Sequence, residues 1–301
     1  MKKSTRAFLQ EAKSTAHFSL FDRLHGYIYL RWPYLYIAVG KGKHPLAKMT
    51  SPLLRLYDWL SRKKNKEKSP GMADMYHGKA MPLESVKQLV NIKQEIQLEN
   101  LEQVIPFSRA KDIILKNPES IAVIDCPCRR SVPNPCLPLD VCIIVGEPFA
   151  SFALEHHPNN ARRITQAEAQ TILEEEDQRG HVHHAFFKDA MLNRFYAICN
   201  CCSCCCGAML AHQHGTPMLI SSGYICQVEE LLCVGCGACA KVCQFDAISM
   251  EEVAHIDSRA CLGCGVCVNH CPQGALKLVR DETKPQPLEI KQLISRQKIT
   301  L

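Results

Sequence analysis

Residues 233–271 read CVGCGACAKVCQFDAISMEEVAHIDSRACLGCGVCVNHC. This stretch contains the pattern C-x2-C-x2-C-x3-C twice, as Cys233, Cys236, Cys239 and Cys243 and then as Cys261, Cys264, Cys267 and Cys271. Soft thiolates are the ligands that iron–sulfur clusters take in proteins. Glycines fill the gaps at positions 235, 237, 263 and 265, and positive φ at glycine lets backbone N–H groups turn toward cluster sulfurs. The two quartets therefore predict a site for iron and sulfide.

The two quartets belong to an internal repeat. A shift of 28 residues aligns LCVGCGACAKVCQFDAISM with ACLGCGVCVNHCPQGALKL. Apolar segments precede the two loops, at residues 224–228 and 253–256. Each half therefore predicts a strand, a cysteine loop, one helical turn and a return strand.

Residues 222–281, about a fifth of the chain, resemble the bacterial-type two-cluster 4Fe-4S ferredoxin domain. The resemblance implies a pseudo-twofold α+β fold, one-electron transfer and two 4Fe-4S clusters, with the fourth cysteine of each run ligating the other cluster. It implies one cluster on Cys233, Cys236, Cys239 and Cys271, and a second on Cys261, Cys264, Cys267 and Cys243. Gln244 departs from the family, which usually has proline after the fourth cysteine, as in Cys271-Pro272. Structural zinc is the alternative, although zinc needs neither a third loop cysteine nor this repeat.

The length of 301 residues leaves room for about two domains, and 47% apolar residues suffice for a globular core. We expect an N-terminal region at 1–75, a cysteine-rich domain at 76–221, the dicluster ferredoxin domain at 222–281 and a tail helix at 282–301. The predicted fold class is α+β, in which a mixed α/β middle domain precedes the ferredoxin-like domain.

The N-terminal region is basic and aromatic. Residues 1–68 contain 15 Lys and Arg and 4 Asp and Glu, which gives this region a charge of +11. Since the net charge of the whole chain is +6, the rest of the chain has a charge of −5. Basic and aromatic residues together suit partner docking or contact with an anionic membrane surface, and an ordinary packed extension is the alternative. Nucleic-acid binding is disfavoured because no recognition motif accompanies the charge. A helix is expected to begin at Ser51-Pro52.

The middle domain predicts alternating helices and strands. One helix begins near Glu84 and extends to Ile96, another follows Ser108 and stops at Asn117, and a third runs from a capping box at Thr165 to about residue 177. Strands are expected at residues 121–124, 141–145, 181–187 and 195–198. An amphipathic tail after Pro287 is expected to pack back on the body.

Ten further cysteines lie in the middle domain: Cys126, Cys128, Cys136, Cys142, Cys199, Cys201, Cys202, Cys204, Cys205 and Cys206. They stand at the ends of predicted strands, so they converge at one edge of the sheet if those strands are neighbours. Side chains alternate in an extended stretch, which separates Cys199 and Cys201 from Cys202, and Cys204 and Cys206 from Cys205. We expect a subset to hold one or two further iron–sulfur clusters; structural zinc and free or redox-active thiols are the alternatives.

Arg129 and Arg130 follow Cys128 directly. They either stabilise a reduced cluster or form an ordinary surface pair. Cys226 lies outside the ligand pattern and is expected to be a buried structural thiol.

These features predict an iron–sulfur electron-transfer protein that relays electrons to or from a redox enzyme. The alternatives are an oxidoreductase whose middle domain holds a substrate-binding cluster, and a thiol-based redox sensor; no catalytic residue can be named. Thiolates must stay reduced to hold clusters, and no secretory signal follows Lys2 and Lys3. A cytoplasmic or membrane-peripheral location is therefore expected.

Overall fold

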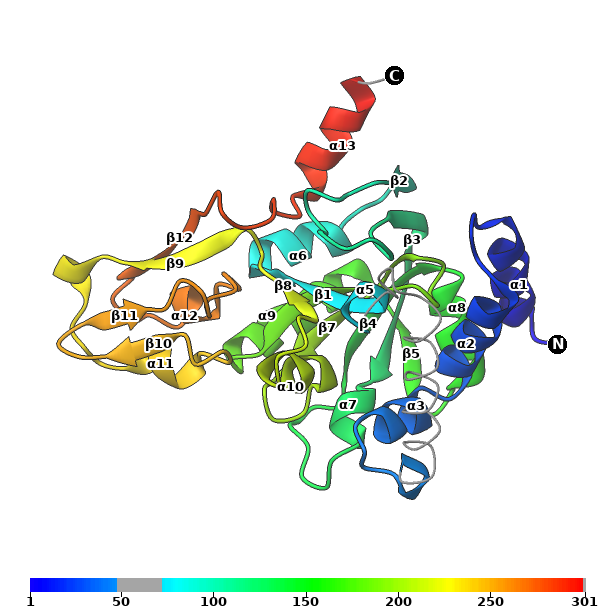
Figure 1. The fold of residues 1–301 in the computed structure, drawn as a ribbon, viewed down its shortest axis with the longest axis horizontal. Coiled ribbons are helices and arrows are strands. Elements are labelled where there is room, and N and C mark those ends of the chain that lie inside the picture. The colour runs from blue at the N-terminus through cyan, green and yellow to red at the C-terminus, as the bar shows by residue number, and fades with distance from the viewer. Residues whose placement is uncertain (48–71, 300–301) are drawn as a thin grey trace, which may run out of the picture.

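The computed structural model describes residues 1–47 and 72–299 (Figure 1). It mixes helices and strands, as the predicted α+β class requires, around one large sheet. The strand order of that sheet is β2 (Ile96–Leu98), β3 (Ile113–Asp125), β4 (Asp140–Glu147), β7 (Arg194–Cys201), β6 (Val182–Lys188), β1 (Tyr76–Met81) and β8 (Leu219–Ile220), and β5 (Ala161–Ile164) also pairs with β3. The pair β1–β8 is parallel, and the other neighbours in this sheet are antiparallel.

The sheet separates two apolar cores. One face packs against α6 (Leu83–Val90) and α9 (Gln166–Gln178), and the other against α8 (Phe149–His156) and α10 (Gly207–Gln213). Strand β6 contributes to both cores, because the successive residues Phe186 and Phe187 point to opposite faces. Both phenylalanines are almost completely buried, so β6 is an interior strand rather than an edge.

Local signals fixed the ends of α9. The Thr165 hydroxyl accepts a hydrogen bond from the backbone N–H of Glu168 at 3.1 Å, which is the expected N-terminal cap. Gly180 follows the helix with a φ of 78°, a conformation that favours glycine. The strands expected around residues 121–124, 141–145, 181–187 and 195–198 are parts of β3, β4, β6 and β7.

Two helix predictions were wrong. The helix from Glu84 ends at Val90, and Ile96 begins strand β2 instead of a further turn. The segment after Ser108 is strand β3, in which Ile113 and Leu115 point inward alternately and pair with β2. In both segments the apolar residues fit a helical spacing in the sequence, but they form strands because β2 and β3 pair with each other and bury alternate side chains.

Within residues 1–47 the N-terminal region contains the helices α1 (Lys3–Ser14), α2 (Leu20–Arg31) and α3 (Pro33–Gly40), which form a layer, and the short helix α5 (Met72–Met75) directly precedes β1. Phe8 and Phe18 are buried in the second core, whereas Phe21 on α2 is 71% exposed. A nearly buried ion pair joins Arg194 of β7 to Glu11 of α1 at 2.7 Å. These residues are therefore a packed layer on the body, and membrane contact by their exposed side chains stays a prediction.

The helix expected at Ser51-Pro52 lies outside the described residues. Within residues 1–47 and 72–299, no helix has the length and apolar character needed to cross a bilayer.

Residues 224–280 form a module that projects from one end of the body (Figure 1). Strand β9 (Tyr224–Val228) pairs antiparallel with β12 (Leu276–Arg280), and β10 (Ile248–Met250) pairs with β11 (Ala254–Ile256). The short helices α11 (Ala238–Val242) and α12 (Val266–Asn269) follow the two cysteine loops, and a 3-10 turn spans Glu230–Leu232. The tail returns to the body, where Leu288 and Ile290 at the start of α13 (Ile290–Ile299) are buried in the first core.

The module contacts the C-terminal end of α9. Asn269 Nδ2 donates to Asp177 Oδ2 at 2.9 Å, and a His270 ring nitrogen lies 3.1 Å from the Gln178 carbonyl oxygen. Gln244 makes two further bonds: its Nε2 donates to the Gly180 carbonyl at 3.0 Å, and its Oε1 accepts from the Ser203 N–H at 2.9 Å. The residue that replaces the usual proline thus joins the module to the cysteine-rich loop after β7.

Candidate metal centres

The two cysteine loops of the module depend on glycine. Gly235, Gly237, Gly263 and Gly265 all have φ between 64° and 86°. A Cβ on Gly263 would lie 2.1 Å from the Tyr224 carbonyl oxygen, and one on Gly235 would lie 2.6 Å from that of Glu252. Both the positive φ and the close backbone contact therefore exclude a side chain, and the loops can curl tightly around a ligand.

Cysteines from both halves of the repeat converge. Cys233, Cys236, Cys239 and Cys271 line one cavity, together with Pro272 and Leu276. At the other site Cys243 lies near Cys261 and Cys267, and Cys264 lies near all three of these thiols. Burial raises the pKa of the Cys243 thiol, and the neighbouring thiolates raise it further. Each group contains three cysteines of one loop and the fourth cysteine of the other, and four soft thiolates suit a 4Fe-4S cluster.

Cys226 is buried on β9, and the Cys267 thiol donates to its Sγ at 3.6 Å. It therefore contacts one of the predicted ligands while standing outside the repeat. Its buried position is the one expected for a structural thiol.

Six cysteines of the middle domain close into a ring of thiol neighbours, here called the six-sulfur ring. Cys126 contacts Cys128 and Cys142, Cys199 contacts Cys142 and Cys201, and Cys206 contacts Cys128 and Cys201. The Cys142 and Cys199 sulfurs are 3.9 Å apart. Strands β3, β4 and β7 are neighbours, so the cysteines at their ends meet at one edge of the sheet. Hydrogen bonds from Cys142 and Cys201 lower the pKa of Cys199 to about 7, so its thiol is partly ionised at neutral pH.

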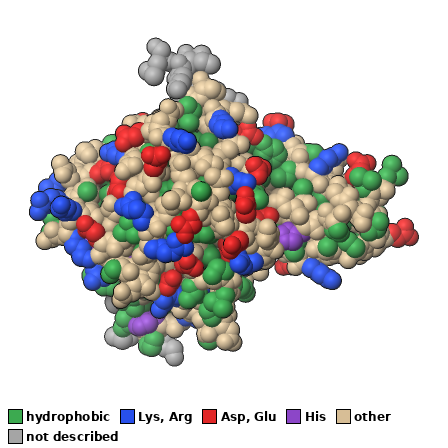
Figure 2. All heavy atoms as spheres, turned by 180° about the vertical axis from the view of Figure 1, so that it is seen from behind, with side chains coloured by type: hydrophobic (Ala, Val, Ile, Leu, Met, Phe, Trp, Pro, Cys, Tyr) green, Lys and Arg blue, Asp and Glu red, His purple; other side chains and the backbone are tan. Residues whose placement is uncertain are grey.

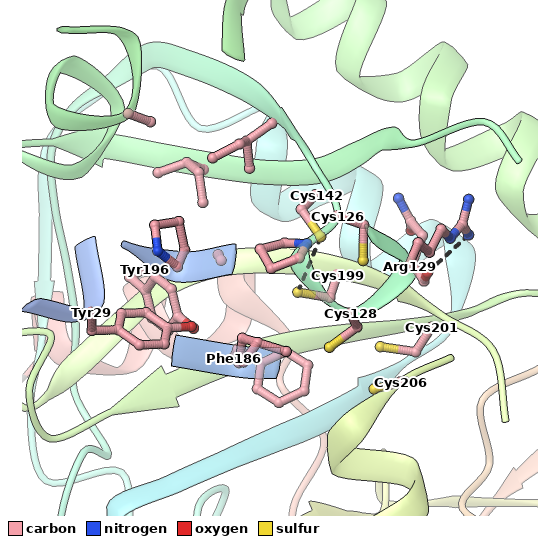
Figure 3. A pocket seen from close by; sticks show the side chains of 18 of the residues that line it. Tyr29, Cys126, Cys128, Arg129, Cys142, Phe186, Tyr196, Cys199, Cys201 and Cys206 are labelled. Atoms are coloured by element: carbon pink, nitrogen blue, oxygen red, sulfur yellow. Dashed lines mark hydrogen bonds between the residues drawn. The ribbon is translucent and has the colours of Figure 1, made fainter. Parts of the chain in front are cut away.

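An apolar cavity of about 80 Å³ adjoins the six-sulfur ring (Figure 3). All six sulfurs belong to residues that line it, and Phe186, Tyr29 and Tyr196 line its other side. The two tyrosine hydroxyls are hydrogen-bonded to each other at 2.7 Å. Tyr29 comes from α2, so the N-terminal layer helps to close this cavity over the sulfurs.

The other four cysteines form a separate group, here called the four-sulfur group: Cys136, Cys202, Cys204 and Cys205. All four sulfurs lie within 4.8 Å of one another. Cys199 and Cys201 are separated from Cys202, as strand alternation predicts, but Cys204 lies with Cys205 instead of Cys206. The physical reason is that β7 ends at Cys201 and the chain then turns, with the Cys206 N–H donating to the Cys202 carbonyl at 3.0 Å.

The two arginines after Cys128 have different roles. Arg130 is at the surface and pairs with Asp125 at 2.7 Å. Arg129 is 1% exposed, so the surface interpretation is wrong for it; its guanidinium pairs with the equally buried Glu176 and donates to the Asn200 carbonyl at 3.2 Å. A buried, paired cation so close to the cysteines favours added negative charge there.

Two lysines that the sequence did not single out also lie at the site. Lys41, just after α3, donates to the carbonyl oxygens of Cys205 at 2.7 Å and Cys128 at 3.3 Å. The Lys188 ammonium lies 5.0 Å from the centre of the Tyr29 ring and 5.1 Å from that of Tyr76, and burial lowers its pKa to about 8. No local motif distinguishes these two lysines from the other Lys and Arg residues, of which the chain contains 36 in all. Only the tertiary fold brings them to the site.

Residues 232–275 match the family model of the 4Fe-4S dicluster domain. No curated protein matches the chain. The family match covers the loops of both halves of the repeat and supports a ferredoxin-type domain that binds 4Fe-4S. Together with the cysteine groups of the middle domain, it supports iron–sulfur binding and ferredoxin-like electron transfer.

Proposed function

We propose that this protein is an electron relay with two 4Fe-4S clusters in the module and a third iron–sulfur cluster on the six-sulfur ring. The single observation that supports it best is the cavity that Cys271 shares with Cys233, Cys236 and Cys239. That grouping is the one that crossed ligation requires. When bound, such clusters accept and release single electrons, and the chain supplies their ligands, burial and charge.

The six-sulfur ring suits a third cluster for three reasons. Cys142, Cys199 and Cys201 lie on the neighbouring strands β4 and β7, and the other three ring cysteines lie at or in the short helices α7 (Pro127–Arg130) and α10 beside them, so little reorganisation is needed on binding. The adjoining cavity of about 80 Å³ leaves room for several atoms. Lys188 and Lys41 place positive charge around a cofactor that becomes more negative on reduction, which raises its reduction potential, whereas the charge of Arg129 is balanced by Glu176.

This assignment predicts the metal content. The anaerobically purified protein should contain about twelve irons and as many sulfides in cubanes, about four per cluster. Replacing two ring cysteines, Cys142→Ala with Cys199→Ala, should reduce both numbers to about eight, because only the module then keeps its ligands. Iron and acid-labile sulfide assays check this, with Cys226→Ala as the control that should leave both unchanged. If the unaltered protein contains only eight irons and eight sulfides, the proposal of a third cluster is contradicted.

Gln244 is proposed to be a positioning residue at the junction between the module and the cysteine-rich loop. It follows Cys243, a predicted ligand, and its side chain bonds to the N–H of Ser203, which stands between Cys202 and Cys204. Its second bond, to the Gly180 carbonyl, fixes the same side chain to the end of α9. The two bonds therefore hold the module close to the middle-domain cysteines, which is what electron transfer between them needs.

Gln244→Ala should slow reduction of the middle-domain centre by the module, because the junction loses both side-chain bonds and can open. Iron and sulfide content should be unchanged, since no ligand is lost. Rapid-freeze paramagnetic resonance after reduction of the module measures the rate. Gln273→Ala, which changes an exposed glutamine of the same module, is the matched control. Equal rates in the two variants would contradict the positioning role.

The free end of the module is the proposed docking surface for a redox protein. Three apolar side chains surround Cys233 there, here called the tip patch: Leu231, Leu232 and Val234, which are 95%, 50% and 65% exposed. Cys236 is exposed beside them. Figure 2 shows apolar side chains on the projecting module, interspersed with Lys, Arg, Asp and Glu side chains. An exposed apolar patch at a cluster ligand suits brief contact with an electron-transfer partner.

Charging the tip patch should weaken that contact. Leu231→Asp with Val234→Asp should slow reduction by a reduced bacterial-type ferredoxin roughly tenfold, the factor that about 1.4 kcal/mol of docking free energy corresponds to. Reduction by dithionite should not change, because a small ion needs no docking surface. Stopped-flow absorbance measures both rates, and Leu24→Asp on α2 is the control at a leucine that is 58% exposed elsewhere. Tip and control variants with equal ferredoxin rates would count against the proposal.

The apolar cavity favours a second candidate function, in which the ring cluster has an iron without a thiolate and binds a small substrate. The six ring cysteines line the cavity together with Cys202 and Cys205, and the aromatic side chains leave its other side apolar. An open iron predicts that added cyanide changes the paramagnetic resonance spectrum of the middle-domain centre and leaves the signals of the module unchanged. If cyanide does not alter the spectrum, the substrate-binding function is contradicted and the electron relay is the one candidate function that stands.

A further inference from the structure

The four-sulfur group is distinct from the six-sulfur ring and lies closer to the surface. Cys202 and Cys205 are buried, Cys136 is partly buried and Cys204 is exposed. Cys136 comes from the loop between α7 (Pro127–Arg130) and β4, and the other three come from the loop between β7 and α10. Cys136 and Cys204 are 68 residues apart in sequence, so two distant loops bring four thiols to one point, with Ser203 beside it.

The spacing of these sulfurs matches one metal ion. The Cys136 and Cys204 sulfurs are 3.2 Å apart, those of Cys204 and Cys205 are 3.6 Å apart, and no pair exceeds 4.8 Å. A tetrahedral ion with metal–sulfur bonds of about 2.3 Å places its ligands about 3.8 Å apart, inside this range. A cubane holds its four thiolates farther apart, because each binds a different iron. The group is therefore too compact for a cubane and suits a single ion.

The surrounding backbone is built to hold the group in place. The Cys205 and Cys206 N–H groups both donate to the Cys202 carbonyl, at 3.3 Å and 3.0 Å, so the loop forms a closed turn. Lys41 fastens both loops, because its ammonium bonds to the Cys205 carbonyl and, at 2.8 Å, to the Ser131 hydroxyl. Its positive charge also offsets part of the net −2 that four thiolates and a divalent ion would carry.

We propose that Cys136, Cys202, Cys204 and Cys205 bind one divalent thiophilic ion, zinc or iron, as a mononuclear tetrathiolate centre. Both ions accept four thiolates in tetrahedral geometry. The centre fixes the cysteine-rich loop at the point where Gln244 of the module reaches Ser203. It extends the proposed relay by a site that contains no sulfide, and it does not depend on a cluster at the six-sulfur ring.

The test is metal and sulfide analysis of the full-length protein after anaerobic purification. The unaltered protein should contain one equivalent of zinc or iron beyond the iron that its sulfide accounts for. The double variant Cys136→Ser with Cys204→Ser should lose that equivalent and keep all of its sulfide. These two cysteines are the least buried of the group, and Ser203→Ala in the same loop is the matched control that should keep the ion. X-ray absorption at the edge of the lost metal should show four sulfurs at about 2.3 Å and no neighbouring metal.

Three results would overturn the mononuclear centre. Loss of iron together with equal sulfide from the double variant would mean that the group belongs to a cluster. A metal equivalent that persists in the double variant would place the ion elsewhere. A preparation without the extra equivalent, with Cys136 and Cys204 joined as a disulfide, would make the group a thiol pair. The sulfide count of the control shows separately whether the module and ring clusters are present.

Discussion

Thiolate ligation of iron is the constraint on which the rest of this structure depends. A cluster needs several soft ligands at once, while neighbouring thiolates repel one another and are costly to bury without a metal. In the module, tight glycine loops hold three thiols together, and the fold places Cys271 of the second half beside those of the first. Gly263 has no room for a side chain against the Tyr224 backbone, which shows how closely the loop is fitted.

The middle domain solves the same problem with a sheet. Strands β3, β4 and β7 are adjacent, so cysteines near their ends meet without any local sequence repeat. The N-terminal layer then covers the site: Tyr29 closes the cavity, and Lys41 ties together the loops that carry Cys128 and Cys205. A basic segment that could have served only as an external docking surface therefore also supplies a wall and a positive charge beside the cysteine groups of the middle domain.

Features that depend on residues close together in the sequence could be predicted from the sequence, whereas features that depend on contacts between distant residues could not. The module is visible in the sequence because ligand spacing and glycine positions are local. The convergence of the ten middle cysteines depended on strand order, which the sequence left conditional, and their division into two groups depended on a turn after Cys201. The segment after Ser108 was mistaken for a helix because its partner strand was not known. The sequence left Arg129 open between a residue that stabilises a reduced cluster and a surface residue, because its buried partner Glu176 is distant in sequence.

The most direct test of the account is an iron-edge anomalous difference map from crystals grown without oxygen. Crossed ligation predicts two four-iron cubes in the module, one bounded by the sulfurs of Cys233, Cys236, Cys239 and Cys271 and the other by those of Cys261, Cys264, Cys267 and Cys243. A map in which each run of four cysteines surrounds its own metal centre, or in which the module holds single zinc ions, would contradict it.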